Sequence, residues 1–146
     1  MMHVKKRIWL LCLAALSLFL VFKIAFNPYA RISRYVNQNE GNLRASCEFY
    51  LNQKYVNKAD TEIDFMGIYG GDNKIVQFFY SGKGIAPASV YYGFYYSPED
   101  VAVPYCNVDY ELNVVREGVW TWDGGGDNGG KIRKIRDNWY YYEAWF

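Results

Sequence analysis

Two pairs of carboxylates are the residues of this chain with the clearest potential for chemistry. Glu62 and Asp64 stand two positions apart in a predicted strand, and Asp123 and Asp127 flank a glycine-rich stretch. Two carboxylates supply the acid and the nucleophile or base of glycoside hydrolysis. Acids at this spacing also form the ordinary solvated face of a strand. A carboxylate-dependent glycan hydrolase is therefore the most distant of three candidate functions.

The stretch at residues 123–128 has oxygen ligands that calcium accepts. It lacks the Asp-x-Asx-x-Asx-Gly spacing of the calcium-binding EF-hand loop, and a plain hairpin turn fits it better. It also lacks the Gly-Lys-Ser/Thr ending of a phosphate-binding loop, and a predicted strand follows it in place of a helix. We therefore predict a turn here, with no metal and no cofactor.

The single histidine, His3, lies close to the N-terminus. The remainder of the chain consequently lacks a Ser-His-Asp or Cys-His nucleophile system, a histidine general base and a histidine metal ligand. This composition excludes many hydrolase classes and predicts that the protein is not an enzyme.

Aromatic side chains make up 20% of the residues and concentrate in predicted strands. Because one helix covers only one face of a sheet, the surplus Tyr and Trp are expected on a binding surface. The candidate binding surface comprises Tyr91, Tyr95, Trp120, Trp122, Trp139 and Tyr141. We expect a protein partner, as in an inhibitor, immunity or envelope-assembly role, with a cell-surface glycan as the alternative. Tyrosine also suits half-exposed strands without any binding site.

Residues 8–26 form an apolar segment preceded by the basic run Lys5-Lys6-Arg7. Nineteen residues at about 1.5 Å per residue nearly span the hydrocarbon core of a bilayer. A cleaved signal peptide is the alternative, but no small-residue pair marks a good cleavage site. We therefore predict a single-pass signal-anchor in the cell membrane of a bacterium. Residues 1–7 would form a cytoplasmic tail, and the C-terminal domain would lie outside.

The three cysteines divide between the apolar segment and the outer domain. Cys12 lies in the segment, where it acts as a small hydrophobic residue. Cys47 and Cys106 remain as an even pair in an oxidising compartment. They are predicted to form a disulfide.

The net charge of +1 conceals an asymmetry along the chain. Residues 1–34 carry six basic and no acidic side chains, whereas residues 35–146 carry ten basic and fifteen acidic ones, a net charge of −5. A domain that binds nucleic acid is normally basic. Nucleic acid is therefore excluded as an expected partner.

The order of predicted elements gives the fold class. Residues 27–41 read as a juxtamembrane connector, and Asn42 as the cap of a helix that runs to about residue 56. Beyond the helix, apolar and polar residues alternate as in strands, with a turn at residues 81–84. Strands are expected at residues 61–69, 74–80, 90–96, 119–123 and 132–146. The pattern at residues 110–115 is compatible either with a further strand or with a loop.

We therefore expect an α+β protein in which an N-terminal transmembrane helix precedes one small domain. In that domain, residues 42–146, a single helix packs on an antiparallel meander of about five strands.

Overall fold

The computed structural model of the protein describes residue 17 and residues 27–52, 63–71, 73–85 and 88–146. The chain divides into two units, residues 1–31 and 32–146, and the architecture below is that of the second. No helix among the described residues is long and apolar enough to cross a membrane. Apart from Ser17, the predicted anchor at residues 8–26 lies outside the described residues.

The helix that covers the sheet, α2 (Pro28–Asn52), begins earlier than the sequence predicts. Pro28 suits the first turn, where its missing N–H leaves no hydrogen bond unmade. The side chain of Asn27 accepts a hydrogen bond of 3.1 Å from the backbone N–H two residues on and so caps the helix. The expected connector is thus helical from its second residue, and Asn42 lies exposed inside the helix. The buried stripe of α2 comprises Ile32, Val36, Leu43, Cys47 and Tyr50.

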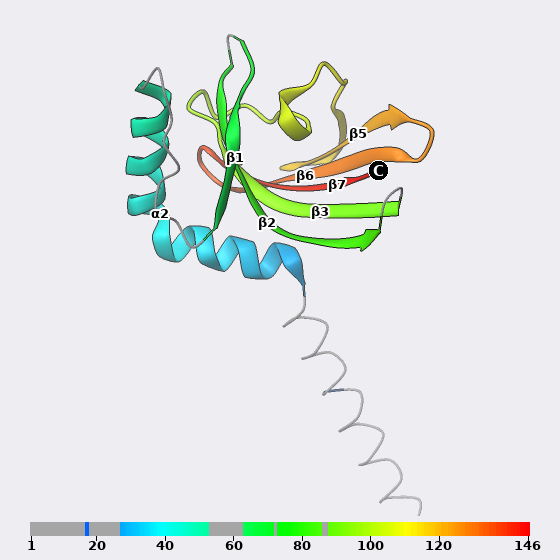
Figure 1. The fold of residues 1–146 in the computed structure, drawn as a ribbon, viewed down its shortest axis with the longest axis horizontal. Helices are drawn as coiled ribbons and strands as arrows, with labels where there is room; N and C mark the ends of the chain where they lie inside the picture. The colour runs from blue at the N-terminus through cyan, green and yellow to red at the C-terminus, as the bar shows by residue number, and fades with distance from the viewer. Residues whose placement is uncertain (1–16, 18–26, 53–62, 72, 86–87) are drawn as a thin grey trace, which may run out of the picture. The chain divides into compact units, whose positions relative to one another are not determined.

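The described strands form one antiparallel sheet in the order β1-β2-β3-β7-β6-β5-β4. The strands are β1 (Asp64–Tyr69), β2 (Ile75–Ile85), β3 (Ala88–Tyr96), β4 (Asn113–Arg116), β5 (Val119–Gly125), β6 (Asn128–Arg136) and β7 (Trp139–Trp145). The chain first builds a meander from β1 to β3. It then crosses to the far edge through residues 97–112, the crossover segment, and returns from β4 to β7 beside β3 (Figure 1). The α+β class is therefore confirmed.

The sheet has seven strands where the sequence predicts about five. The expected closing strand, residues 132–146, is divided into β6 and β7 by a turn at Asp137 and Asn138. Asn138 supplies the left-handed backbone of this turn with φ 68°, which asparagine tolerates better than most residues. Residues 81–84 are not a turn, because β2 continues through them and they pair with β3 beyond a bulge between Phe79 and Ser81. β4, which follows the crossover segment, accounts for the remaining additional strand.

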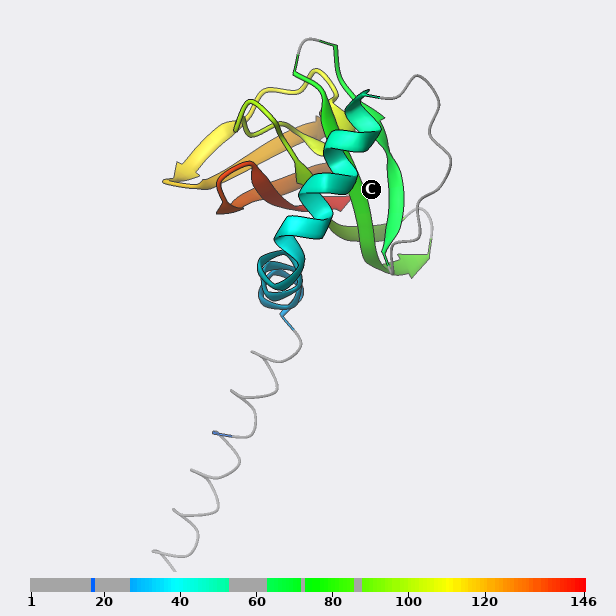
Figure 2. The same ribbon diagram turned by 90° about the vertical axis from the view of Figure 1, so that its left-hand side faces the viewer.

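Aromatic rings join α2 to one face of the sheet, in front of which the helix lies in Figure 2. Tyr50 of the helix stacks on Phe65 of β1 with 4.4 Å between ring centroids. Phe78 and Phe94 of the next two strands stack at 4.9 Å. Phe94 then meets Trp139 of β7 at 6.0 Å. Burial of rings on this scale stabilises the helix–sheet contact far more than helix propensity does.

An ion pair on α2 adds polar contacts between the helix and the sheet. Arg44 donates to Glu40 at 2.7 Å and to the hydroxyl of Tyr96 at 3.0 Å. The indole N–H of Trp139 also donates to Glu40, at 3.4 Å. The hydrogen bond from Arg44 holds the pKa of Glu40 below its usual range.

The opposite face of the sheet is covered by the crossover segment. The hydroxyl of Tyr95 accepts a hydrogen bond from the N–H of Val103 at 2.9 Å and donates to its carbonyl at 3.1 Å. The buried amide of Gln77 accepts from the N–H of Cys106 at 3.0 Å. Beneath the segment lies a second core that comprises Ile75, Tyr95, Val103, Trp122, Ile132, Tyr140, Tyr142 and Ala144. Each face of the sheet is therefore covered in part by another element of the same chain.

Candidate functional site

The six predicted binding aromatics do not form one exposed surface. Four of them are buried, with 0% of Tyr95, 3% of Trp122, 0% of Trp139 and 3% of Tyr141 exposed. Tyr91 and Trp120 are half-buried. The set is also divided between the two faces, because Trp139 contacts rings under α2 whereas Tyr95 lies in the core under the crossover segment. The expectation of an uncovered aromatic face is wrong, since the sequence does not reveal that residues 97–112 fold back over it.

The buried tyrosines act as structural hydrogen-bonding groups. Burial raises the pKa of Tyr95 above its usual value near 10, and burial, together with the charge of Glu143, does the same for Tyr141. Both phenols therefore remain neutral at physiological pH. Tyr95 binds the backbone of Val103, and Tyr141 donates to Glu143 at 3.4 Å. Neither is available as a base or a nucleophile.

The predicted disulfide is not formed, and both Cys47 and Cys106 are free thiols. Cys47 belongs to the buried stripe of α2, on the helix-covered face. Cys106 lies on the other face, where the amide of Gln77 approaches its sulfur at 3.8 Å. The sheet stands between the two thiols, which explains why the even number of cysteines misleads. Burial raises the pKa of both, so neither is an activated nucleophile.

The candidate carboxylates do not form a catalytic or metal-binding group in the described part of the chain. Glu62 lies outside the described residues, and Asp64, Asp123 and Asp127 are exposed. Asp123 accepts a hydrogen bond of 2.8 Å from the N–H of Gly125 at the β5–β6 hairpin. The predicted hairpin turn is therefore confirmed. Among the described residues, no group of three His, Cys, Asp or Glu side chains is placed to hold a metal ion.

Asp100 makes more hydrogen bonds than the other carboxylates of the described residues, and it is not among the predicted site residues. Its carboxylate accepts from Lys134 at 2.6 Å, from the Asn138 N–H at 2.8 Å and from the Tyr140 hydroxyl at 2.9 Å. Burial alone raises its pKa, but these hydrogen bonds outweigh burial and hold the pKa below its usual value. The side chain ties the start of the crossover segment to the β6–β7 turn. This role is structural.

β4 is the most exposed strand and an edge of the sheet. All four of its residues are exposed, with Val114 at 72% and Val115 at 59%. Val114 pairs with Trp120 of β5, and Tyr110, 42% exposed, stacks on Trp122 of the same strand at 5.2 Å. Apolar side chains therefore line an edge whose outer backbone groups have no partner strand among the described residues.

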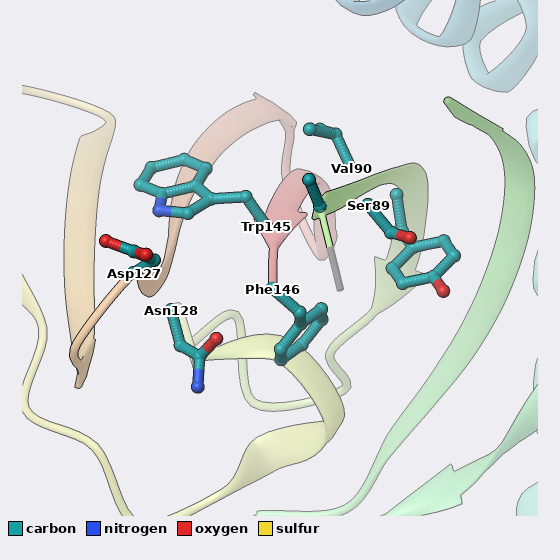
Figure 3. Close-up of a pocket in the computed structure, with 8 residues that line it drawn as sticks. Ser89, Val90, Asp127, Asn128, Trp145 and Phe146 are labelled. Carbon is teal, nitrogen blue, oxygen red and sulfur yellow. The ribbon is translucent and has the colours of Figure 1, made fainter. Parts of the chain in front are cut away.

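A second accessible region lies at one end of the sheet, around Trp145 (Figure 3). The beginning of β3, the end of β7 and the β5–β6 turn enclose an open hollow of about 840 Å³. A smaller hollow of about 450 Å³ adjoins it. Both are lined by Trp145, Asp127 and Asn128, which we call the rim site. Of the residues that line the larger hollow, Tyr91 belongs to the predicted binding surface, and Asp127 was predicted only as a carboxylate or calcium ligand.

No family model, curated protein or solved structure matches this chain. The strand edge at β4 and the rim site are the features of the described residues that bear on function.

Proposed function

We propose that the protein is a membrane-anchored domain that binds a protein partner outside the cell membrane and has no enzymatic activity. Residues 8–26 would form the anchor, with the N-terminus in the cytoplasm. The observation that carries the binding role is the open edge at β4, where Val114 and Val115 expose their side chains next to unpaired backbone groups.

Addition of a strand is the mode of binding that this edge supports. An extended segment of a partner forms main-chain hydrogen bonds with an exposed edge, and its alternate side chains pack on both sides. β4 suits this mode because Val114 and Val115 both expose apolar side chains, at the point where the pairing with β5 shifts by one residue. At the other edge, β1 has half-buried residues from Phe65 to Tyr69 and presents less open surface.

The charges around β4 indicate the chemistry of the partner. Asp109, Glu111 and Glu117 are exposed on either side of the strand, and Arg116 is the basic residue between them. Opposite charges across an interface favour the correct partner and speed its association. We therefore propose that the bound segment carries β-branched apolar residues flanked by lysine or arginine.

Photocrosslinking in native membranes tests this proposal. The full-length chain carries a photoreactive amino acid in place of Val115, or in place of Glu99 as a control on an exposed turn away from the edge. We expect irradiation to give one discrete adduct with another protein from position 115 and none from position 99. The substitution Val114→Lys should remove the adduct, because a lysine on an open edge opposes strand addition and repels a basic segment.

The outcomes of this experiment separate the alternatives. No adduct from position 115, or an adduct that survives Val114→Lys, would refute binding at β4. An adduct formed by two copies of the 17.1 kDa chain would show self-association and would also refute the proposal.

A further inference from the structure

The rim site is built on a flat aromatic platform. Trp145 pairs with Val90 of β3 on one side and with Gly129 of β6 on the other. A Cβ at Gly129 would stand 2.9 Å from the indole nitrogen and 3.0 Å from two ring carbons. The indole therefore lies directly over a strand position that has no side chain. This contact fixes the ring, which is half-exposed and lines both hollows.

Unused polar groups stand beside this platform. Asp127 and Asn128 are exposed at the β5–β6 turn, and their side chains make no hydrogen bond to other described residues. Figure 3 shows Asp127 on the same side of the site as the indole of Trp145. A carboxylate accepts hydrogen bonds, and an amide both accepts and donates them. Together they suit a ligand that is rich in hydroxyl groups.

The charges and the aromatic rings around the rim site argue against two classes of ligand, anions and ammonium groups. No lysine or arginine among the described residues lines either hollow, so the site does not favour an anion. An ammonium cage needs several ring faces directed at one point. In Figure 3, however, the rings of Trp145 and Phe146 point apart. The ring of Phe146 instead packs against Tyr91 at 5.9 Å and Tyr105 at 5.6 Å.

The floor of the larger hollow is held by main-chain hydrogen bonds. Ser89 and Phe146 exchange two of them, each of 2.9 Å. A site on paired strands loses little conformational freedom when a ligand binds. The volume of about 840 Å³ lies within the range of small-ligand sites.

From these observations we infer that the rim site binds a neutral carbohydrate. The apolar C–H face of a sugar ring packs on the indole of Trp145, and its hydroxyl groups bind Asp127 and Asn128. This function is additional to strand addition at β4 and independent of it, because the two sites share no residue.

Isothermal titration calorimetry on the full-length chain tests the inference. The chain is placed in lipid nanodiscs, since sugar-headed detergents would compete for the site. The probes are chitotetraose, cellotetraose and maltotetraose. We expect at least one of them to bind. Trp145→Ala and Asp127→Ala should each weaken that binding by roughly tenfold, the scale of one lost stacking or charged hydrogen-bonding contact.

Asp137→Ala is the matched control, because Asp137 is an exposed aspartate in the hairpin turn at the other end of β6. The Asp137→Ala variant should bind the tetrasaccharide with the same affinity as the unmodified chain. Asp127→Ala alters only an exposed turn, so it keeps the test decisive if Trp145→Ala disturbs folding. The inference is overturned if none of the three probes binds, if Trp145→Ala and Asp127→Ala bind as tightly as the unmodified chain, or if Asp137→Ala weakens binding equally. None of these results bears on the crosslink at β4.

Discussion

Gly93 in β3 is a position where the fold depends on the absence of a side chain. Tyr142 of β7 pairs with it, crosses over it, and donates a hydrogen bond of 3.0 Å to the carbonyl of Phe78. A Cβ at Gly93 would overlap both that carbonyl and the Tyr142 hydroxyl. We expect Gly93→Ala to lower the free energy of unfolding by about 2–3 kcal/mol, through overpacking and a lost buried hydrogen bond. Denaturant unfolding of the full-length chain measures this change.

Gly41 is the matched control for that substitution. It lies within α2, and a Cβ there would meet nothing within 4 Å. Alanine is about 0.5–1 kcal/mol more favourable than glycine inside a helix, so Gly41→Ala should stabilise the protein. Equal effects from the two substitutions would contradict the proposed packing of Tyr142 over β3.

The pH dependence of stability should report on Asp100. Its pKa in the folded protein lies below the usual value near 3.9, so its stabilising effect is complete above that pH and is lost as the pH falls through the folded-state pKa. We expect Asp100→Asn to destabilise the protein by about 1–2 kcal/mol at pH 7, a modest cost because the side chain is 36% exposed. The difference between the two proteins should shrink below about pH 4.

Unfolding measured between pH 3 and pH 7 checks this prediction. Asp137→Asn provides the comparison, because the Asp137 side chain is 90% exposed and should change stability little. A difference between Asp100→Asn and the unmodified protein that is the same at every pH would show that the carboxylate charge does not matter.

At the scale of elements, the crossover segment determines which surfaces are free to bind. It packs on the sheet face opposite α2, where its N–H groups at Val103 and Cys106 donate hydrogen bonds to the buried side chains of Tyr95 and Gln77. With α2 and this segment packed on the two faces, the perimeter of the sheet offers accessible sites for recognition. The strand edge at β4 and the rim site are two such places.

The attachment of this segment can be tested through Tyr95. Tyr95→Phe keeps the ring but leaves the buried N–H and carbonyl of Val103 without this partner, which should cost about 1–3 kcal/mol. It should also speed proteolysis within residues 97–112. Tyr110→Phe, which removes an exposed hydroxyl from the same segment, should change neither quantity. If Tyr95→Phe leaves the rate of proteolysis unaltered, the segment is not held through Tyr95.

At the scale of the whole molecule, local patterns predicted the fold better than the site. Alternation of apolar and polar residues predicted the hairpin of β1 and β2 and the strand at β3. The turn at Asp137 was missed because it contains no glycine and lies between strongly strand-forming residues. The path of residues 97–112 has no period, and it depends on contacts with distant strands.

The same limit explains why four of the six predicted binding aromatics are buried. Alternation identifies strands but not their order, so it cannot show that β4 lies at an edge. It also cannot show that Gly129 lies beneath Trp145. Tyr91 and Trp120 are the two members of the predicted surface that remain accessible, and each lies next to one of the perimeter sites.

The proposed membrane anchor at residues 8–26 would place both the β4 edge and the rim site near the membrane surface. Residues 35–146, with a net charge of −5, are repelled by the anionic lipid of a membrane surface. The domain would therefore remain free of the lipid surface and available to a basic segment of a partner.

Amide hydrogen exchange at β4 tests this account most directly, because strand addition forms backbone hydrogen bonds that side-chain crosslinking does not report. The comparison is between the purified full-length chain in nanodiscs and the same chain in native membranes. We predict that the outward-facing amides of Asn113–Arg116, those not bonded to β5, exchange rapidly in the purified chain and at least about tenfold more slowly in native membranes, with those of β1 unchanged. Equally rapid exchange of the β4 amides in both settings would contradict the proposal that this edge binds a partner.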